Sequence, residues 1–353
     1  MTQRQTCIVT GGAGFIGCAI SSALAERFNR VVAFDILHPQ IHGTTSRPQM
    51  LDKRIELYMA DICDPHAWDR LLDTMGSVDT VVHLAAETGT GQSLNESTRH
   101  GMTNVVGTTS MLDAFSRHKQ IPSQIILASS RAVYGEGAWQ AEDRTVFYPG
   151  QRSDRQLKSG EWDFPGARAL PCEAGNTIPH PTSVYGSTKL AQEHILSAWA
   201  QSFGTSIKIL RLQNVYGPGQ SLINSYTGIV PFFVQLAKQR TAIPLYEDGK
   251  IVRDFVYIDD VSDAIVKALD DSSLCLPILD VGTGQATYIS VLAEMIAERY
   301  GAPYPRVCGR YRNGDVRSAF CLMERTREAL VFSPRWQLKD GLSKLCAWID
   351  GAQ

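Results

Sequence analysis

The sequence predicts an α/β protein with a doubly wound parallel sheet and a smaller, mixed C-terminal lobe. Through about residue 213, short apolar runs alternate with segments of helical periodicity, as parallel strands alternate with the helices that cover them. The first apolar run leads directly into a glycine-rich turn and then into a helical pattern. Farther along the chain the segments become shorter and less regular, which indicates a second lobe.

The first predicted strand and its turn form a dinucleotide-binding motif. Residues 6–10 are apolar, as in a buried parallel strand, and Gly11, Gly14 and Gly17 follow at once. Gly11 permits the tight turn, Gly14 lets a pyrophosphate approach the backbone, and Gly17 lets the helix pack closely on the strand. The N-terminus of that helix offers N–H donors to phosphate oxygens. We therefore expect a Rossmann-type fold.

The second predicted strand, residues 31–34, ends at Asp35. A carboxylate here accepts hydrogen bonds from the hydroxyls of the adenosine ribose. It also repels a 2′-phosphate, since like charges at short range are unfavourable. Asp35 therefore favours NAD over NADP as the cofactor.

The third predicted strand, residues 54–60, is followed by Asp61 and Ile62. The sequence leaves two roles open for Asp61. It either brackets the adenine of a bound dinucleotide or caps the helix predicted at residues 65–73.

Small and polar residues follow the next two predicted strands. The fourth, residues 78–84, leads into Ala85 and Ala86, whose side chains permit close passage of a cofactor. The fifth, residues 124–128, leads to Ser130. Ligands of open α/β sheets bind at the carboxyl ends of the strands, so we expect Ser130 at the site.

Two longer segments flank the fifth strand. One helix is predicted over residues 97–119. Residues from about 136 to 181 are rich in Gly, Pro and polar side chains and show no long periodicity. A segment of this kind is either a lid or binding loop, or a surface insertion.

A predicted helix that begins near residue 183 carries Tyr185 and Lys189. Residues four apart lie on one helix face, so the ammonium is placed to lower the phenol pKa from about 10 toward neutral pH. This pair is suited to proton transfer. The alternative is a tyrosine and a lysine that merely share a solvated face.

The C-terminal part is predicted to add a strand at 207–212, helices at 228–240, 260–268 and 290–300, and a strand at 276–281. It also contains several arginines, whose guanidinium groups suit phosphate oxygens but are also common on solvated surfaces. They are Arg253, Arg306, Arg310, Arg312 and Arg317.

Composition excludes several classes of protein. A formal net charge of −2 gives no basis for nucleic-acid binding or a polybasic membrane surface. No run of about 18 apolar residues predicts a membrane span. The eight cysteines form no CxxC pair, which favours free thiols in the cytoplasm over disulfides or zinc. No metal site is expected, and His83 is interpreted as a core histidine.

These motifs resemble those of the extended short-chain dehydrogenases/reductases, in the branch that acts on nucleotide sugars. The resemblance implies NAD and a nucleoside-diphosphate sugar as ligands, and a homodimer. The residues that carry it are Gly11, Gly14, Gly17, Asp35, Ser130 in Ser-Ser-Arg-Ala-Val-Tyr-Gly, Tyr185 with Lys189, and residues 211–219 and 253–261.

The resemblance also implies how the chain is divided. Residues 1–213 would form the NAD-binding Rossmann lobe, with the insertion at about 136–181 near the active site. Residues 214–353 would form the lobe that binds the nucleotide sugar, with segments about 254–285 returning to the first lobe.

Three groups of site residues follow from the resemblance. The catalytic group is Ser130, Tyr185 and Lys189. The substrate-binding group is Ser130, Arg131, Asn214, Arg253 and Arg317, in which the last two would clamp the diphosphate. The cofactor-binding group is Gly11, Gly14, Phe15, Ile16, Gly17, Asp35, Asp61, Ile62, Leu84, Ala85, Ala86, Tyr185 and Lys189.

Two positions indicate which reaction of the family to expect. Sugar 4,6-dehydratases carry an Asp-Glu pair where this chain has Arg131 and Ala132, so dehydration is not expected. The resemblance instead implies 4-epimerisation through a transient 4-keto sugar and bound NADH. Tyr185 would remove the 4-hydroxyl proton, Ser130 would hold the same oxygen, and Lys189 would bind the nicotinamide ribose and lower the Tyr185 pKa.

Residues 83–93, 130–137 and 212–214 resemble the group of 4-epimerases that act on dTDP-L-rhamnose, a dTDP-6-deoxyhexose of polysaccharide (O-antigen) biosynthesis. The alternatives are a nucleotide-sugar dehydrogenase or reductase, a C2-epimerase, or a non-catalytic NAD-binding scaffold.

Overall fold

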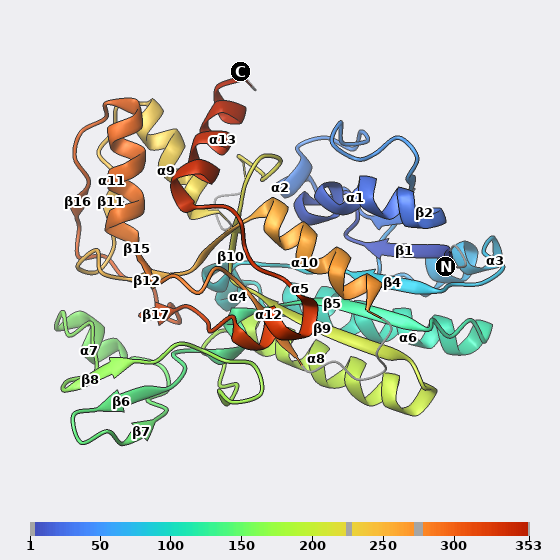
Figure 1. Ribbon diagram of the computed structural model, residues 1–353, viewed down its shortest axis with the longest axis horizontal. Coiled ribbons are helices and arrows are strands. Elements are labelled where there is room, and N and C mark those ends of the chain that lie inside the picture. The colour runs from blue at the N-terminus through green and yellow to red at the C-terminus, as the bar shows by residue number, and fades with distance from the viewer. Residues whose placement is uncertain (1–3, 224–227, 272–277, 352–353) are drawn as a thin grey trace.

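The computed structural model describes residues 4–223, 228–271 and 278–351. Its centre is a seven-stranded, wholly parallel sheet in the order β14-β9-β5-β4-β1-β2-β3 (Figure 1). The predicted doubly wound α/β fold is confirmed. The strands are β1 (Arg4–Thr10), β2 (Phe28–Asp35), β3 (Glu56–Met59), β4 (Thr80–His83), β5 (Gln124–Ser130), β9 (Ser206–Leu212) and β14 (Leu279–Val281).

Strand alternation divides the core into two layers. Ile8 and Val32 face Trp68, whereas Val9 and Ala33 face the opposite layer, because successive side chains of a strand point to opposite faces. The helices of the Trp68 layer are α3 (Pro65–Asp73), α6 (Gly107–His118) and α8 (Val184–Phe203), and those of the other are α1 (Phe15–Arg27) and α10 (Ile258–Asp270).

The single helix predicted over residues 97–119 is interrupted. It consists of α5 (Ser97–Gly101), the π-helical segment η1 (Met102–Val106) and α6. The wider turn buries Asn104, whose side chain accepts from Glu87 N at 2.7 Å and donates to Thr188 Oγ1 at 2.9 Å. Apolar periodicity could not show this interruption, because it depends on contacts with distant segments.

The second lobe packs around its own apolar core, at the upper left of Figure 1. Three of its helices supply much of this core: α9 (Ile229–Lys238), α11 (Ile289–Tyr300) and α13 (Leu338–Gly351). The other elements beyond β9 are β10 (Asn214–Tyr216), β11 (Pro244–Leu245), β12 (Val252–Arg253), β13 (Phe255–Tyr257), β15 (Thr287–Tyr288), β16 (Arg306–Val307), β17 (Ser318–Ala319) and α12 (Glu324–Leu330). The strand predicted at 276–281 lies partly outside the described residues, and its described part is β14.

Residues 136–181 contain more regular structure than their sequence indicates. They form a small antiparallel sheet from β6 (Trp139–Ala141), β7 (Val146–Phe147) and β8 (Ala167–Ala169), together with α7 (Asp154–Lys158). The remaining short helices of the chain are α2 (Pro39–His42), α4 (Thr90–Asn95) and the 3₁₀ turn η2 (Arg131–Tyr134).

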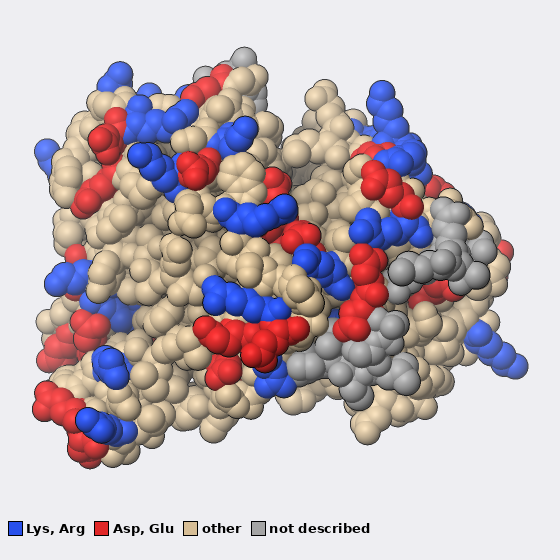
Figure 2. Space-filling model, viewed as in Figure 1, with Lys and Arg blue, Asp and Glu red and all other residues tan. Residues whose placement is uncertain are grey.

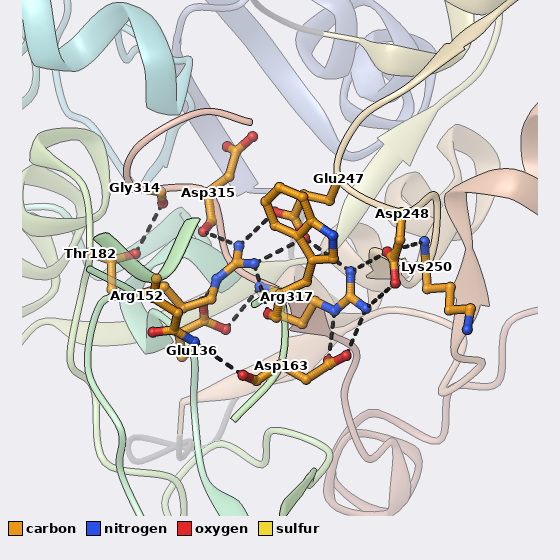
Figure 3. Close-up of polar contacts among 12 residues, drawn as sticks. Glu136, Arg152, Asp163, Thr182, Glu247, Asp248, Lys250, Gly314, Asp315 and Arg317 are labelled. Carbon is orange, nitrogen blue, oxygen red and sulfur yellow. Dashed lines mark hydrogen bonds and ion pairs between the residues drawn. The ribbon is translucent and has the colours of Figure 1, made fainter. Parts of the chain in front are cut away.

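A buried ionic cluster fastens this insertion to the second lobe (Figure 3). Arg152 Nε donates to Glu136 at 3.0 Å and its Nη1 donates to Glu247 at 2.9 Å. Glu247 also accepts from Arg317, whose Nε donates to Asp163 at 2.8 Å. Both arginine side chains are at most 4% exposed, so desolvated charges hold the two parts together. The insertion is therefore anchored and structured.

Acidic and basic side chains are interspersed on the visible face of the molecule (Figure 2). This face carries no large region of one sign, as the small net charge predicts. Within the described ranges, no helix has the length and apolarity that crossing a bilayer requires.

Candidate active site

A cavity of about 660 Å³ opens at the carboxyl edge of the sheet, and residues of both lobes line it. All predicted site residues line this cavity except Lys189, Arg253 and Arg317. The lining includes Gly11, Gly14, Phe15, Ile16, Gly17, Asp35, Asp61, Ile62, Leu84, Ala85, Ala86, Ser130, Arg131, Tyr185 and Asn214.

The glycine-rich turn leaves space that any other residue would fill. Gly11 has φ +67°, and a Cβ there would lie 2.8 Å from Ala85 N. A Cβ on Gly17 would lie 2.4 Å from Gly12 O, so α1 packs on the turn at backbone distance. Gly14 is the N-cap of α1, where free N–H groups favour phosphate. This geometry fits the pyrophosphate of a dinucleotide.

Asp35 is fixed beside that turn. Its Oδ2 accepts from Ala13 N at 3.0 Å and its Oδ1 accepts from Leu37 N at 2.9 Å. A carboxylate has about four acceptor positions, so two remain for ribose hydroxyls on the cavity side. The geometry fits NAD.

We predict that the protein binds NADP at least about tenfold more weakly than NAD, a difference of roughly 1.4 kcal/mol in binding free energy. The reason is repulsion between the anchored Asp35 carboxylate and a 2′-phosphate. Calorimetric titration with both dinucleotides measures the ratio. Asp35→Asn keeps the shape of the side chain but removes its charge, so it should reduce the difference between NAD and NADP affinity. Equal binding of NAD and NADP by the wild type would contradict repulsion by Asp35.

Asp61 lines the cavity and is not the cap of α3. The N-cap is Asp64, which accepts from His66 N at 2.9 Å, whereas Asp61 accepts from Cys63 N at 2.8 Å. The capping alternative for Asp61 is therefore wrong. Ile62 lies in the same wall of the cavity and is buried.

The N-terminus of α8 brings Tyr185 to Ser130. Ser183 caps the helix by accepting from Gly186 N at 3.0 Å. A Cβ on Gly186 would lie 2.5 Å from Ala132 O, so glycine permits α8 to touch η2. The first turn of α8 and the end of β5 therefore place the phenol and the hydroxyl together.

Burial and two neighbouring groups act on the pKa of Tyr185. Burial raises it, while a hydrogen bond from Ser130 and the charge of Arg131 oppose that rise. The sequence assigned this stabilising charge to Lys189. In the structure, Lys189 Nζ instead donates to Gln192 Oε1 at 2.6 Å, and Arg131 is the cation that acts on the phenol. A helical spacing of four residues places two side chains on one face but does not direct both toward one atom.

Lys189 is 2% exposed, and burial lowers its pKa to about 7, against the opposing charge of Glu193. His83 is 1% exposed, and its ring nitrogens pair with Thr10 Oγ1 at 2.6 Å and Thr108 Oγ1 at 2.9 Å. Burial lowers the His83 pKa to about 3, so this histidine is neutral at physiological pH. The core interpretation of His83 is confirmed.

We predict a pH-dependent effect of Lys189 on stability. The folded protein releases this proton near pH 7 and the unfolded chain only near pH 10, so the unfolded chain binds more protons in between. The Lys189 contribution to the free energy of unfolding must then rise with pH across that window. Urea titrations at pH 6 and pH 9 should show wild type gaining stability relative to Lys189→Met. The exposed control Lys53→Met should differ from wild type by the same free energy of unfolding at both pH values. A difference between wild type and Lys189→Met that does not change with pH would contradict the lowered Lys189 pKa.

The charges of Arg131, the residue after Ser130, and Arg253 act on each other. Arg253 is 7% exposed, and burial followed by the charge of Arg131 lowers its pKa to about 9. Neither guanidinium has an ion pair with a carboxylate among the described residues. Two such cations without direct partners favour an anionic ligand.

Arg317 does not have the predicted arrangement. Its Nε, Nη1 and Nη2 all donate to carboxylates, namely Asp163, Glu247 and Asp248 (Figure 3). All three nitrogens are thus occupied by carboxylates, so its assignment to the diphosphate is wrong for this arrangement. Sequence alone could not show that the insertion supplies Asp163.

Sequence reasoning assigned no role to Gln213, although it lines the cavity directly after β9. The position at a strand's carboxyl end was the available signal. Arg312, another C-terminal arginine, lies over α4, since a Cβ on Gly91 would be 4.0 Å from its Cδ.

The glycine turn, Asp35 and the Ser130–Tyr185 pair together define an NAD-dependent enzyme of the doubly wound α/β class. The chain matches the model of the NAD-dependent epimerase/dehydratase family over residues 7–154 and 160–278. It therefore belongs to that family, and NAD is its cofactor.

Relatives with assigned functions match nearly the whole chain. A dTDP-L-rhamnose 4-epimerase of Burkholderia thailandensis is 55% identical over 349 residues, which cover 99% of this chain and 96% of that protein. The UDP-glucose 4-epimerase of Thermotoga maritima, solved with UDP-glucose, has a TM-score of 0.79 at 26% identity and covers 98% of this chain and 99% of its own. The UDP-glucose 4-epimerase of Thermus thermophilus, solved with NAD, has a TM-score of 0.77 at 26% identity, with coverage of 99% and 100%.

Proposed function

We propose that this protein inverts C4 of a dTDP-6-deoxyhexose, with dTDP-L-rhamnose as the substrate. The observation that carries the proposal is the side-chain set at the reacting end of the cavity. Ser130 and Tyr185 can act on one sugar hydroxyl. The two residues after Ser130, Arg131 and Ala132, have no carboxylic acid that could protonate and expel a second hydroxyl. The 55% identity to the Burkholderia enzyme supports the choice of sugar and nucleotide.

NAD, when bound, supplies reversible oxidation at C4. Tyr185 takes the proton of the 4-hydroxyl and later returns it to the same oxygen after the sugar has turned its other face. Ser130 holds that oxygen, and Arg131 stabilises the phenolate between the two transfers. Lys189 keeps its predicted role as the group that binds the nicotinamide ribose, and for this its Nζ would have to exchange its hydrogen bond with Gln192 for one with NAD.

Asn214 and Arg253 bind the phosphate end of the substrate. Asn214 lines the cavity, and its buried Oδ1 has no hydrogen-bond partner in the described parts of the chain. Arg253 brings a buried charge that has no ion pair with a carboxylate in the described parts of the chain. Residues 1–213 thus hold the cofactor and residues 214–353 the nucleotide sugar, while 254–285 return to the sheet through β14.

We predict that Tyr185→Phe lowers kcat by about 10²–10⁴-fold, because the ring is kept but the proton-transfer group is lost. NAD affinity should stay within a few-fold of wild type. C4 inversion of dTDP-L-rhamnose, followed by NMR, measures the effect. Tyr304→Phe, at a side chain that is 71% exposed, is the matched control.

Three results would contradict the proposal. Unchanged turnover by Tyr185→Phe would remove Tyr185 from the chemistry. Stoichiometric reduction of added NAD, seen at 340 nm, would indicate a nucleotide-sugar dehydrogenase or reductase. Inversion at C2 in the NMR spectrum would identify a C2-epimerase.

A homodimer is part of the proposal, and so is location in the cytoplasm. Leu94, Met102 and Val106 lie on α4 and η1 next to α8, with 45%, 46% and 38% of each residue exposed. Burial of these side chains against a second copy would remove apolar surface from water. Seven cysteines within the described ranges are free thiols, which suits a reducing compartment.

We predict that Met102→Glu shifts the protein from dimer to monomer in sedimentation velocity, because a carboxylate would be desolvated in the interface. Val307→Glu, at an exposed residue of β16, should leave the dimer intact. A Met102→Glu protein with the same sedimentation coefficient as wild type would place the contact elsewhere.

A further inference from the structure

Gln213 lies at the reacting end of the cavity. It follows Leu212, the last residue of β9, and Leu212 pairs in register with Ser130 on β5. Neighbouring strands are about 4.8 Å apart, so the Gln213 backbone is one strand away from the serine that holds the reacting oxygen. Its own N–H donates to Val281 O at 2.9 Å, which fixes the backbone.

The side chain of Gln213 is buried and unpaired. The residue is 5% exposed and lines the cavity, yet neither Oε1 nor Nε2 has a hydrogen-bond partner among the described residues. Buried amides are nearly always hydrogen-bonded, since unpaired polar atoms are unfavourable away from water. Two orphaned atoms on one side chain therefore point to a polar group of a ligand.

The fold makes room for this side chain. A Cβ on Gly282 would lie 2.7 Å from Gln213 Cγ, so only glycine permits the amide to lie where it does. The backbone and side chain of Gln213 are held by Val281 and Gly282, which both lie in the described part of the chain.

We propose that Gln213 determines sugar specificity by hydrogen-bonding the hexose hydroxyl at C3. This inference rests on the proposed 4-epimerase function. Ser130 and Tyr185 hold the oxygen on C4, and Gln213 is the next polar group along that edge. In a 6-deoxyhexose, C5 carries a methyl group and the ring oxygen, so the hydroxyl next to C4 is the one on C3.

An amide suits this task better than a charged side chain, which can only donate or only accept. Inversion requires the sugar to present both faces of C4 in turn, and this moves the neighbouring hydroxyl relative to the protein. Nε2 donates and Oε1 accepts, and the C3 hydroxyl can do either. Gln213 can therefore keep a hydrogen bond to the sugar in both orientations.

The test compares wild type, Gln213→Leu and Gln213→Met on three substrates: the parent dTDP-6-deoxyhexose and its 3-deoxy and 2-deoxy analogues. C4 inversion by NMR gives kcat/KM. Wild type should prefer the parent over the 3-deoxy analogue by roughly 10- to 100-fold, because the analogue leaves the buried amide unpaired. Both variants should lose about that factor on the parent and the 2-deoxy sugar, but change less than about threefold on the 3-deoxy sugar.

Two further readouts separate binding from folding. Replacing an unpaired buried amide by an apolar side chain of similar size should leave the melting temperature unchanged or raise it. NAD affinity should also be unchanged. Gln239→Leu, at an exposed residue after α9, is the matched control and should behave as wild type throughout.

Each other outcome overturns a stated part. An equal loss on all three sugars, or a lower melting temperature in both variants, would make Gln213 a structural residue. If the Gln213 variants lose kcat/KM on the parent and the 3-deoxy sugar but not on the 2-deoxy sugar, Gln213 contacts the hydroxyl at C2, which contradicts the assignment to C3. Failure of the wild type to invert the parent sugar, with NAD still bound, would contradict the proposed function, and this inference would fall with it.

Discussion

The buried ion pair between Glu193 and Arg211 joins the elements that carry the active site. Arg211 Nη2 lies 2.7 Å from Glu193 Oε2, and both side chains are 3% exposed. Glu193 also accepts from Ser129, and the Arg211 guanidinium lies 4.7 Å from the centroid of the Tyr134 ring. Removing one member of a buried pair leaves an uncompensated charge, at a cost of about 3–5 kcal/mol.

This network fixes the positions of the reacting groups. Glu193 is on α8, two turns beyond Tyr185, and Ser129 precedes Ser130 on β5. From Tyr134 the network continues to Asp280 on β14, which accepts from the tyrosine hydroxyl at 2.9 Å. Asp280 in turn accepts from Ala174 N of the insertion at 2.7 Å. A network of hydrogen bonds, one ion pair and one cation–π contact therefore joins the helix that carries Tyr185, the strand that carries Ser130 and the edge strand β14.

Charge in the site is distributed differently from a simple tyrosine–lysine pair. Lys189 is buried with a lowered pKa and is bonded to Gln192. Arg131, next to Ser130, and Arg253 carry charge with no carboxylate ion pair among the residues that the structure describes. A negatively charged diphosphate and a phenolate both suit such an environment. The carboxylates of the ionic cluster in Figure 3 are engaged with Arg152 and Arg317, so that cluster holds the insertion in place rather than serving the ligand.

The sequence by itself determined the fold class, the glycine turn with Asp35, and the identity of the tyrosine and serine at the site, because each depends on local pattern: strand, turn, helix start and strand end. Only the tertiary structure decided which way long side chains point. Arg317 pairs with Asp163 of the insertion, Lys189 bonds to Gln192, and the Gln213 side chain in the cavity has no partner among the described residues. The direction of Arg317 depends on partners more than 60 residues away in sequence. The direction of Lys189 depends on its rotamer within one turn of α8. Spacing along a single chain does not specify either.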